Sequence, residues 1–112
     1  MTLTMEKESE VFVLGLSGKV DAEDSNVLLE RITGILEGGG RHVLLDFTGA
    51  TYINSSGLHA LVIAGKKLAI AGGQLILAAP SDPILKVFKI SGISSVLPVY
   101  STQAQALSSF RR

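Results

Sequence analysis

The sequence predicts a small α/β sandwich with a mostly parallel sheet of four to five strands and about four helices. Short β-branched and apolar runs alternate with stretches of helical periodicity, which requires crossover connections between parallel strands. The first two extended runs are separated by only three residues, which predicts an antiparallel hairpin at one edge of the sheet. A chain of 112 residues can bury one core but not two, so we expect a single domain over residues 1–112.

The expected order of elements is β-β-α-β-α-β-α-β-α. The strands are expected at Thr2 to Lys7, Val11 to Val20, Val43 to Phe47, Gln74 to Ala79 and Val96 to Tyr100, with a short extended piece from Thr51 to Ile53. The helices are expected from Asp21 to about Glu37, from Ser55 to about Ala71, from Ser81 to Gly92, and from Ser101 towards the C-terminus. Alternation is clearest in the second strand, VFVLGLSGKV.

The first helix has a clear start, a buried stripe and a stop. Asp21, with Asp24 three residues later, can cap it, and acids in a first turn suit the helix dipole. Glycines 38–40 end it. The apolar residues at helical spacing, expected to be buried, are Leu28, Ile32, Ile35 and Leu36.

The two C-terminal helices also have local start signals. The run Ser81-Asp82-Pro83 places a capping side chain before a proline, whose missing N–H costs nothing at the first helical position. Ser101 is expected to cap the last helix, which Leu107 and Phe110 would anchor to the sheet.

The stretch Val43 to Leu58 organises the rest of the chain. A buried strand closes at the turn Thr48-Gly49, and Asn54-Ser55-Ser56-Gly57 then opens a helix. Either Asn54 or Ser55 can cap this helix by accepting a hydrogen bond from an unpaired N–H group of the first turn. Ser56 would then lie at the positive end of the helix dipole, where an anion is tolerated.

The two faces of this second helix differ in composition. The residues expected to lie on the sheet are Leu58, Leu61, Val62, Gly65, Leu68 and Ala69. The residues expected on the opposite face are Ser56, His59, Ala60, Ile63, Lys66 and Lys67. A single exposed isoleucine is ordinary, but a continuous ridge that starts at a capping serine is also what a partner-docking surface would present.

Bulk properties exclude several classes of function. Ten basic residues balance ten acidic ones, so no nucleic-acid surface is expected. The absence of cysteine excludes disulfides and a thiolate zinc site. The most apolar stretch, Leu68 to Pro80, is too short to span a membrane, and the acidic N-terminus does not resemble a signal peptide. We therefore expect a cytoplasmic protein.

No residue pattern predicts catalysis. The glycine run 38–40 lacks the Lys-Ser or Lys-Thr of a phosphate-binding loop, and His42 and His59 show no metal-ligand spacing. Ser56 and His59 lack both the nucleophile elbow and an acid to orient the histidine. Asp46 has the position of a receiver-domain phosphoacceptor, but the accompanying acids are missing, so a turn-forming role fits better. We expect a non-enzyme without cofactor or metal.

The run LLDFTGATYINSSGL resembles the signature of STAS domains, the family of bacterial anti-sigma-factor antagonists and of the cytoplasmic domains of sulfate transporters. The segment Leu16 to Asp21 is similar to the family's Gly-x-Leu/Val-Asp segment between its second strand and first helix. The order of elements agrees as well. The resemblance covers essentially the whole chain and implies a STAS-like sandwich.

The resemblance also implies a mechanism. In antagonists of this family the second Ser of an Asp-Ser-Ser-Gly motif is phosphorylated by an anti-sigma factor that is also a serine kinase, of the GHKL type. That position is Ser56 here, with Ser55 as the less favoured acceptor. The unphosphorylated form binds the anti-sigma factor, and a serine phosphatase restores it. The implied partner-binding residues are Asp21, Asn54, Ser55, Ser56, Gly57, His59 and Ile63.

Alternatives remain open at this point. Asn54 replaces the usual Asp, which preserves a cap but removes a charge beside Ser56. A second hypothesis is a constitutive interaction module of a larger regulatory or transport-associated complex, in which both serines serve only as helix caps. For Asp21 taken alone, a helix cap is favoured over a partner contact. A third possibility is an enzyme or small-ligand protein that uses the Asn54 to His59 loop as a pocket.

Overall fold

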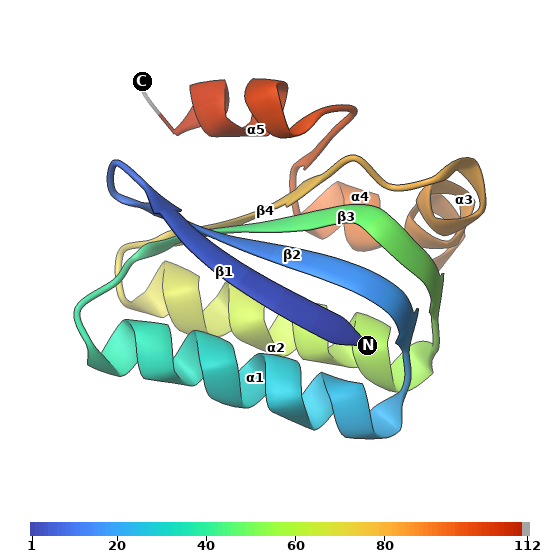
Figure 1. The fold of residues 1–112 in the computed structure, drawn as a ribbon, viewed down its shortest axis with the longest axis horizontal. Coiled ribbons are helices and arrows are strands. Elements are labelled where there is room, and N and C mark those ends of the chain that lie inside the picture. The colour runs from blue at the N-terminus through green and yellow to red at the C-terminus, as the bar shows by residue number, and fades with distance from the viewer. Residues whose placement is uncertain (111–112) are drawn as a thin grey trace.

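A computed structural model describes residues 1–110 and shows one five-stranded sheet with helices on both faces (Figure 1). The strands are β1 (Thr2–Glu8), β2 (Val11–Val20), β3 (His42–Ile53), β4 (Gln74–Ala78) and β5 (Val99–Tyr100). The helices are α1 (Ala22–Glu37), α2 (Ser55–Ile70), α3 (Asp82–Ser91), α4 (Ile93–Val96) and α5 (Gln103–Ser109). Along the sheet the strands follow their order in the sequence.

The pairing of the strands confirms the predicted fold class. β1 and β2 form the expected antiparallel edge hairpin, with a register that runs from Thr2 opposite Ser17 to Glu8 opposite Val11. The pairs β2–β3, β3–β4 and β4–β5 are all parallel. Each parallel connection passes through at least one helix, as the alternating pattern of the sequence requires.

The predicted break between two extended pieces in the third strand is wrong, because β3 is continuous. Its residues Phe47 and Thr48 lie opposite the single residue Leu16 of β2, which is a β-bulge. The Asp46 carboxylate accepts hydrogen bonds from Thr48 N at 2.9 Å and from Thr48 Oγ1 at 2.6 Å. Asp46 therefore does shape a local turn, as expected, but that turn is accommodated within the strand.

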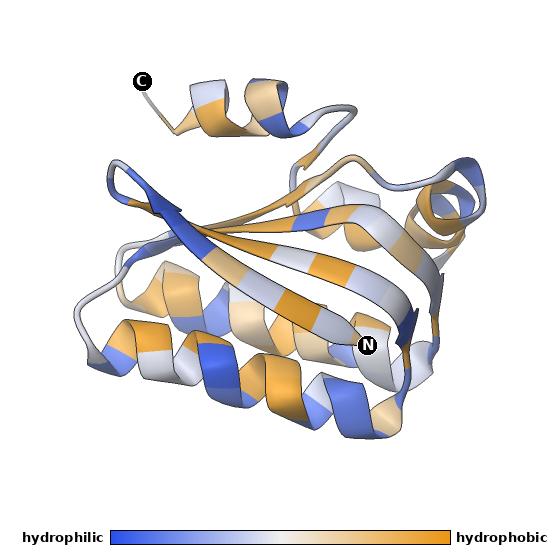
Figure 2. Cartoon of the chain, in the orientation of Figure 1, coloured by the Kyte–Doolittle hydropathy of each residue, from blue (hydrophilic) through white to orange (hydrophobic). Residues whose placement is uncertain are grey.

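The sheet separates two clusters of buried side chains. The larger cluster fills the space between the sheet and the helices α1 to α4, and includes Phe47 packed edge-to-face on Phe88 with ring centroids 5.2 Å apart. The smaller cluster lies under α5, where Ala106 is fully buried and the predicted anchors Leu107 and Phe110 pack beside it. Figure 2 shows hydrophobic colour over much of the central strands, and alternating hydrophilic and hydrophobic colour along α1.

The C-terminal third differs from the prediction in its details. Gly92, with φ 86°, ends α3 and begins the unpredicted helix α4, which takes Val96 out of the last strand. Leu97 is then buried, and only two residues are left to pair as β5. Thr102 caps α5 instead of Ser101, because its Oγ1 accepts a hydrogen bond from Gln105 N at 3.1 Å.

The start of α3 also differs in one respect. Ser81 does occupy the N-cap position, but its side chain makes no capping hydrogen bond, and the proline lies at the second helical position. Within residues 1–110, no helix has both the length and the apolar character needed to cross a membrane.

Candidate functional site

Two helices begin side by side at the carboxyl ends of the parallel strands β2 and β3. β2 ends at Val20 and β3 ends at Ile53, and these two residues are paired in the parallel ladder. Asn54 N donates a hydrogen bond to Val20 O at 3.2 Å, which ties the two strand ends together. Asp21 and Asn54 follow directly as the N-caps of α1 and α2, so both helices start at the same place (Figure 1).

The first turn of α2 leaves two serines exposed. Asn54 has extended backbone geometry, and its Oδ1 accepts a hydrogen bond from Gly57 N at 2.9 Å. The cap is therefore Asn54, and this decides between the two predicted candidates. Ser55 and Ser56 are the first two helical residues, and neither hydroxyl has a hydrogen-bond partner within residues 1–110. The Ser56 hydroxyl thus lies free at the positive end of the helix.

Gly57 determines how closely this turn approaches the sheet. A Cβ atom at this position would lie 2.6 Å from Ile53 Cγ1 and 3.3 Å from Val20 Cγ1. These distances are shorter than ordinary contacts, so a larger residue would push the start of α2 away from the strand ends. The glycine of the Asn-Ser-Ser-Gly run therefore positions Ser56 by allowing a tight fit.

The start of α1 is held mainly by hydrogen bonds to carboxylates. Asp21 Oδ1 accepts from Glu23 N at 3.1 Å and from Asp24 N at 3.2 Å, while Asp24 Oδ2 accepts from Asp21 N at 3.1 Å. This is a complete capping box. The hydrogen bond from the Asp21 backbone N–H is the main reason why the pKa of Asp24 lies below its ordinary value. Asp21 is a helix cap in this structure, and its contact with a partner remains a prediction.

A shallow hollow of about 350 Å³ separates the first turns of the two helices. It is lined by Ala22, Ser25, Asn26, Leu29, Ser56, His59, Ala60 and Ile63. The structure therefore brings Ser56, His59 and Ile63 together with a wall of α1 that the sequence analysis missed. The signal that could have revealed this wall is the pair of small residues Ser25 and Ala60, whose burial brings the two helices close.

The expected division of α2 into two faces needs correction. Ala60, expected on the exposed ridge, is buried, whereas Leu58 and Val62 are only partly buried and Ala69 is exposed. The cause is that α2 packs on α1 as well as on the sheet, so its buried stripe is turned towards α1. Ser56 and His59 do lie on the exposed side, and Ile63 is partly buried at the rim of the hollow.

The hollow and the first turn of α2 contain few charged groups. The first turn of α2 contains no acid, while Lys67 lies in its last turn and donates to Thr33 Oγ1 at 3.5 Å. Over the part of the chain that the structure describes, no group of three His, Asp or Glu side chains is arranged to hold a metal ion. The hollow presents a hydroxyl, an imidazole and apolar side chains, and its lining contains no carboxylate to orient His59.

Comparison with known proteins identifies the family. The sequence model described as the STAS domain matches residues 2–106. The chain belongs to the STAS domain family. A relative from Bordetella bronchiseptica, BtrV, named as a candidate anti-sigma factor antagonist, is 31% identical over 111 residues, which cover 99% of this chain and 96% of BtrV. The predicted resemblance is thereby confirmed.

Solved STAS structures share the fold. A Thermotoga maritima protein described as a candidate anti-sigma factor antagonist superposes with a TM-score of 0.92 at 19% identity, covering 98% of this chain and 95% of that protein. The antagonist SpoIIAA in its unphosphorylated form gives a TM-score of 0.76 at 24% identity, with 98% of each chain covered. The phosphorylated form of SpoIIAA, from Bacillus, gives 0.77 at 22% identity, covering 97% of this chain and 99% of SpoIIAA. At these identities the likeness concerns the fold.

Proposed function

We propose that this STAS domain is an anti-sigma factor antagonist, a non-catalytic protein that binds an anti-sigma factor and is switched off by phosphorylation of Ser56. The observation that carries the proposal is the position of the Ser56 hydroxyl. It is exposed, it has no hydrogen-bond partner within residues 1–110, and it lies at the N-terminus of α2 on the rim of the α1–α2 hollow. The names of BtrV and SpoIIAA supply the class of partner.

The fold can accept a phosphate at this position. A phosphoserine carries a charge of about −1.5 to −2, and the N-terminus of a helix stabilises such an anion. Asn54 and Gly57 make the cap hydrogen bond without the Ser56 hydroxyl, so modification need not disturb the first turn. The new charge would instead change the surface that the partner contacts, through repulsion and the cost of desolvation.

The proposed contact surface comprises the residues around the hollow and the two helix starts. Ile63 and Leu29 supply apolar area, and His59 supplies a polar contact between Ser56 and Ile63. Asn54 and Gly57 contribute mainly by fixing the position of the serines. The remaining members of the proposed surface are Asp21 and Ser55. The partner would be a GHKL-type serine kinase acting as anti-sigma factor, with a serine phosphatase resetting the switch.

Asn54 bears directly on whether the switch operates. An Asp at this position would use the same kind of oxygen to cap Gly57 N, so the shape of the turn does not depend on the charge. The absence of an acid from the first turn of α2 also means that a phosphate on Ser56 meets no like charge within that turn. These two points favour phosphorylation of Ser56 with Asn54 in place.

The experiment compares what the wild-type chain and three variants capture from a lysate of the source bacterium. We expect wild type, Ser56→Ala and the matched control Ser55→Ala to retain one GHKL-type kinase, and Ser56→Asp to lose at least nine tenths of it. Incubation of the captured kinase with ATP should label wild type and Ser55→Ala but not Ser56→Ala, as measured by mass spectrometry of the intact chain.

Three results would contradict the proposal. Equal capture by wild type and Ser56→Asp, repeated with protein phosphorylated at Ser56, would leave a constitutive interaction module whose serines only begin a helix. Labelling that persists in Ser56→Ala and disappears in Ser55→Ala would move the acceptor to Ser55. Turnover of a small substrate by the purified chain, abolished by Ser56→Ala, would show an enzyme instead.

A further inference from the structure

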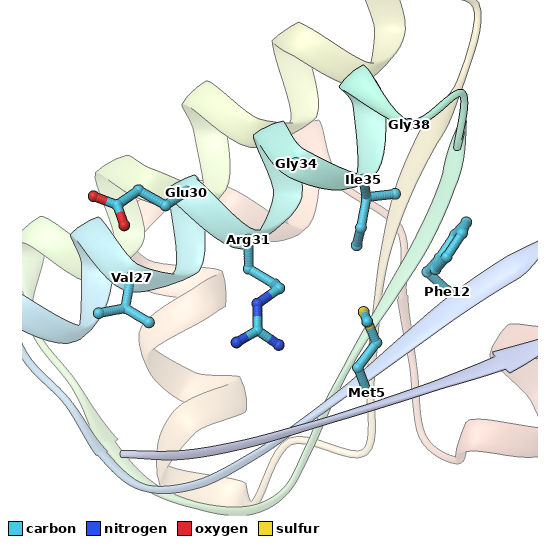
Figure 3. Close-up of a pocket in the computed structure, with 8 residues that line it drawn as sticks. All are labelled: Met5, Phe12, Val27, Glu30, Arg31, Gly34, Ile35 and Gly38. Atoms are coloured by element: carbon cyan, nitrogen blue, oxygen red, sulfur yellow. The ribbon is translucent and has the colours of Figure 1, made fainter.

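A second concave surface lies on the other side of α1, between that helix and the β1–β2 hairpin (Figure 3). This groove has a volume of about 460 Å³. It is lined by Met5, Phe12, Val27, Glu30, Arg31, Gly34, Ile35 and Gly38. It shares no lining residue with the Ser56 hollow, so the two surfaces can be tested independently.

The floor and walls of the groove are mainly apolar. Met5 and Val27 are two of the few large hydrophobic side chains that remain well exposed, at 48% and 46%. Phe12 and Ile35 close the end of the groove near Gly38 (Figure 3). Gly34 leaves one wall open, because a Cβ atom built there would have no atom within 4 Å. The volume lies within the range of about 300–1,000 Å³ that is typical of small-molecule sites.

One cation, Arg31, points into the groove, although Glu30 also belongs to its lining. The Arg31 guanidinium extends from α1 towards β1, whereas the Glu30 carboxylate points away from it (Figure 3). No carboxylate of residues 1–110 lies within 4 Å of Arg31. Lys7 lies outside the lining of the groove, with its Nζ 5.2 Å from the Phe12 ring centroid. Alternation along β1 places Glu6 on the opposite face of the hairpin from Met5 and Lys7.

We propose that this groove binds a small amphipathic anion, of which a medium-chain alkyl carboxylate is the chemical type. The alkyl chain would cover Met5, Phe12 and Val27, and the carboxylate would accept hydrogen bonds from the Arg31 guanidinium. A single cation beside an apolar surface matches a ligand with one anionic end. The groove is open to solvent, so a ligand in it stays partly hydrated and the expected Kd is on the order of 0.1–1 mM.

The test is an NMR titration of the ¹⁵N-labelled chain with sodium decanoate below its micelle concentration, with decanol as the uncharged control. We expect decanoate to bind roughly tenfold more tightly than decanol and to shift the amides of Met5, Phe12, Gly34 and Gly38 but not that of Ser56. Arg31→Gln should weaken decanoate binding by about five- to tenfold and leave decanol unchanged. The matched control Glu30→Gln should not weaken it.

A groove-filling variant separates the site from nonspecific binding. Gly34→Leu places a side chain into open space on a helix and favours the helix itself, so the variant should fold and lose binding of both ligands. Equal affinity for decanoate and decanol, an unchanged affinity in Arg31→Gln, or shifts centred elsewhere would overturn the proposal. So would sedimentation that shows a dimer whose formation is blocked by Gly34→Leu, because a second copy would then occupy the groove.

Discussion

The two helices that start at the same edge of the sheet are held in different ways. α1 begins with a complete capping box, and Glu23 and Asp24 lie in its first turn. α2 begins with one hydrogen bond from Gly57 N to Asn54 and has no acid in its first turn. The positive end of α1 is thus neutralised by the chain itself, while that of α2 is left uncompensated within its first turn.

This difference separates a structural role from a functional one. Carboxylates at the start of α1 satisfy its N–H groups and would repel an added phosphate. At the start of α2 the tight fit of Gly57 against Ile53 fixes the turn, so the neighbouring serine is free of any structural hydrogen bond. If phosphorylation is to change binding without unfolding the protein, the modified serine must lie at a helix start where its hydroxyl makes no structural hydrogen bond.

The largest effect on stability is expected from Gly57→Ala. The added Cβ would lie 2.6 Å from Ile53 Cγ1, and relief of that overlap should lower the free energy of unfolding by about 2 kcal/mol. Urea unfolding followed by circular dichroism measures it. The control is Gly34→Ala, where the Cβ meets nothing within 4 Å and helix propensity should raise stability by about 0.5–1 kcal/mol. A loss at Gly57 no larger than the change at Gly34 would show that the fit is loose.

The next largest effect on stability is expected from removing the N-cap side chains of α1 and α2, and the two losses should differ. Asp21→Ala removes the two capping hydrogen bonds to the Asp21 carboxylate, keeps the backbone N–H that binds Asp24, and should cost about 1–2 kcal/mol. Asn54→Ala removes only the bond to Gly57 N, and should cost about 0.5–1 kcal/mol. Thermal or urea unfolding of both variants tests the order. If Asn54→Ala proved the more damaging, hydrogen bonding rather than close packing would hold α2.

The same contrast explains what the sequence could predict. The start of α1 follows from Asp21 and Asp24, because a capping box is a local pattern with a fixed spacing of three residues. The Asn-Ser-Ser-Gly run likewise located the start of α2 and the position of Ser56. Both signals depend only on residues close together in the chain.

The parts that were missed depend on contacts between distant residues. The burial of Ala60 follows from the packing of α2 on α1, which no periodicity in α2 alone could show. The β-bulge in β3 requires the register of β2, and α4 follows from the left-handed backbone of Gly92 together with the burial of Leu97. The groove beside Arg31 belongs to two elements, and became visible only when α1 was placed against the hairpin.

The smallest expected effect is a dependence on pH that distinguishes the two helix starts. The pKa of Asp24 is lowered below its ordinary value of 3.8, chiefly by the Asp21 backbone N–H, with further contributions from the Asp21 side chain and the α-amino group of Met1. Because the folded pKa is lower than the unfolded one, the stabilisation from this carboxylate is present above pH 3.8 and is lost as the pH falls through the folded value.

The Asp24→Asn variant should therefore lose less stability than wild type on acidification below pH 3.8, as measured by urea unfolding at a series of pH values. Asn26→Asp, two residues further along α1, keeps Asp24 and serves as a control that adds a negative charge instead of removing one. Because the first turn of α2 has no acid, Asn54→Ala should leave the slope of stability against pH unchanged. Equal slopes of stability against pH in wild type and Asp24→Asn would mean that the capping box of α1 stabilises the helix through its geometry and not through its charge. The electrostatic contrast between the two helix starts would then rest only on the absence of acids from the first turn of α2.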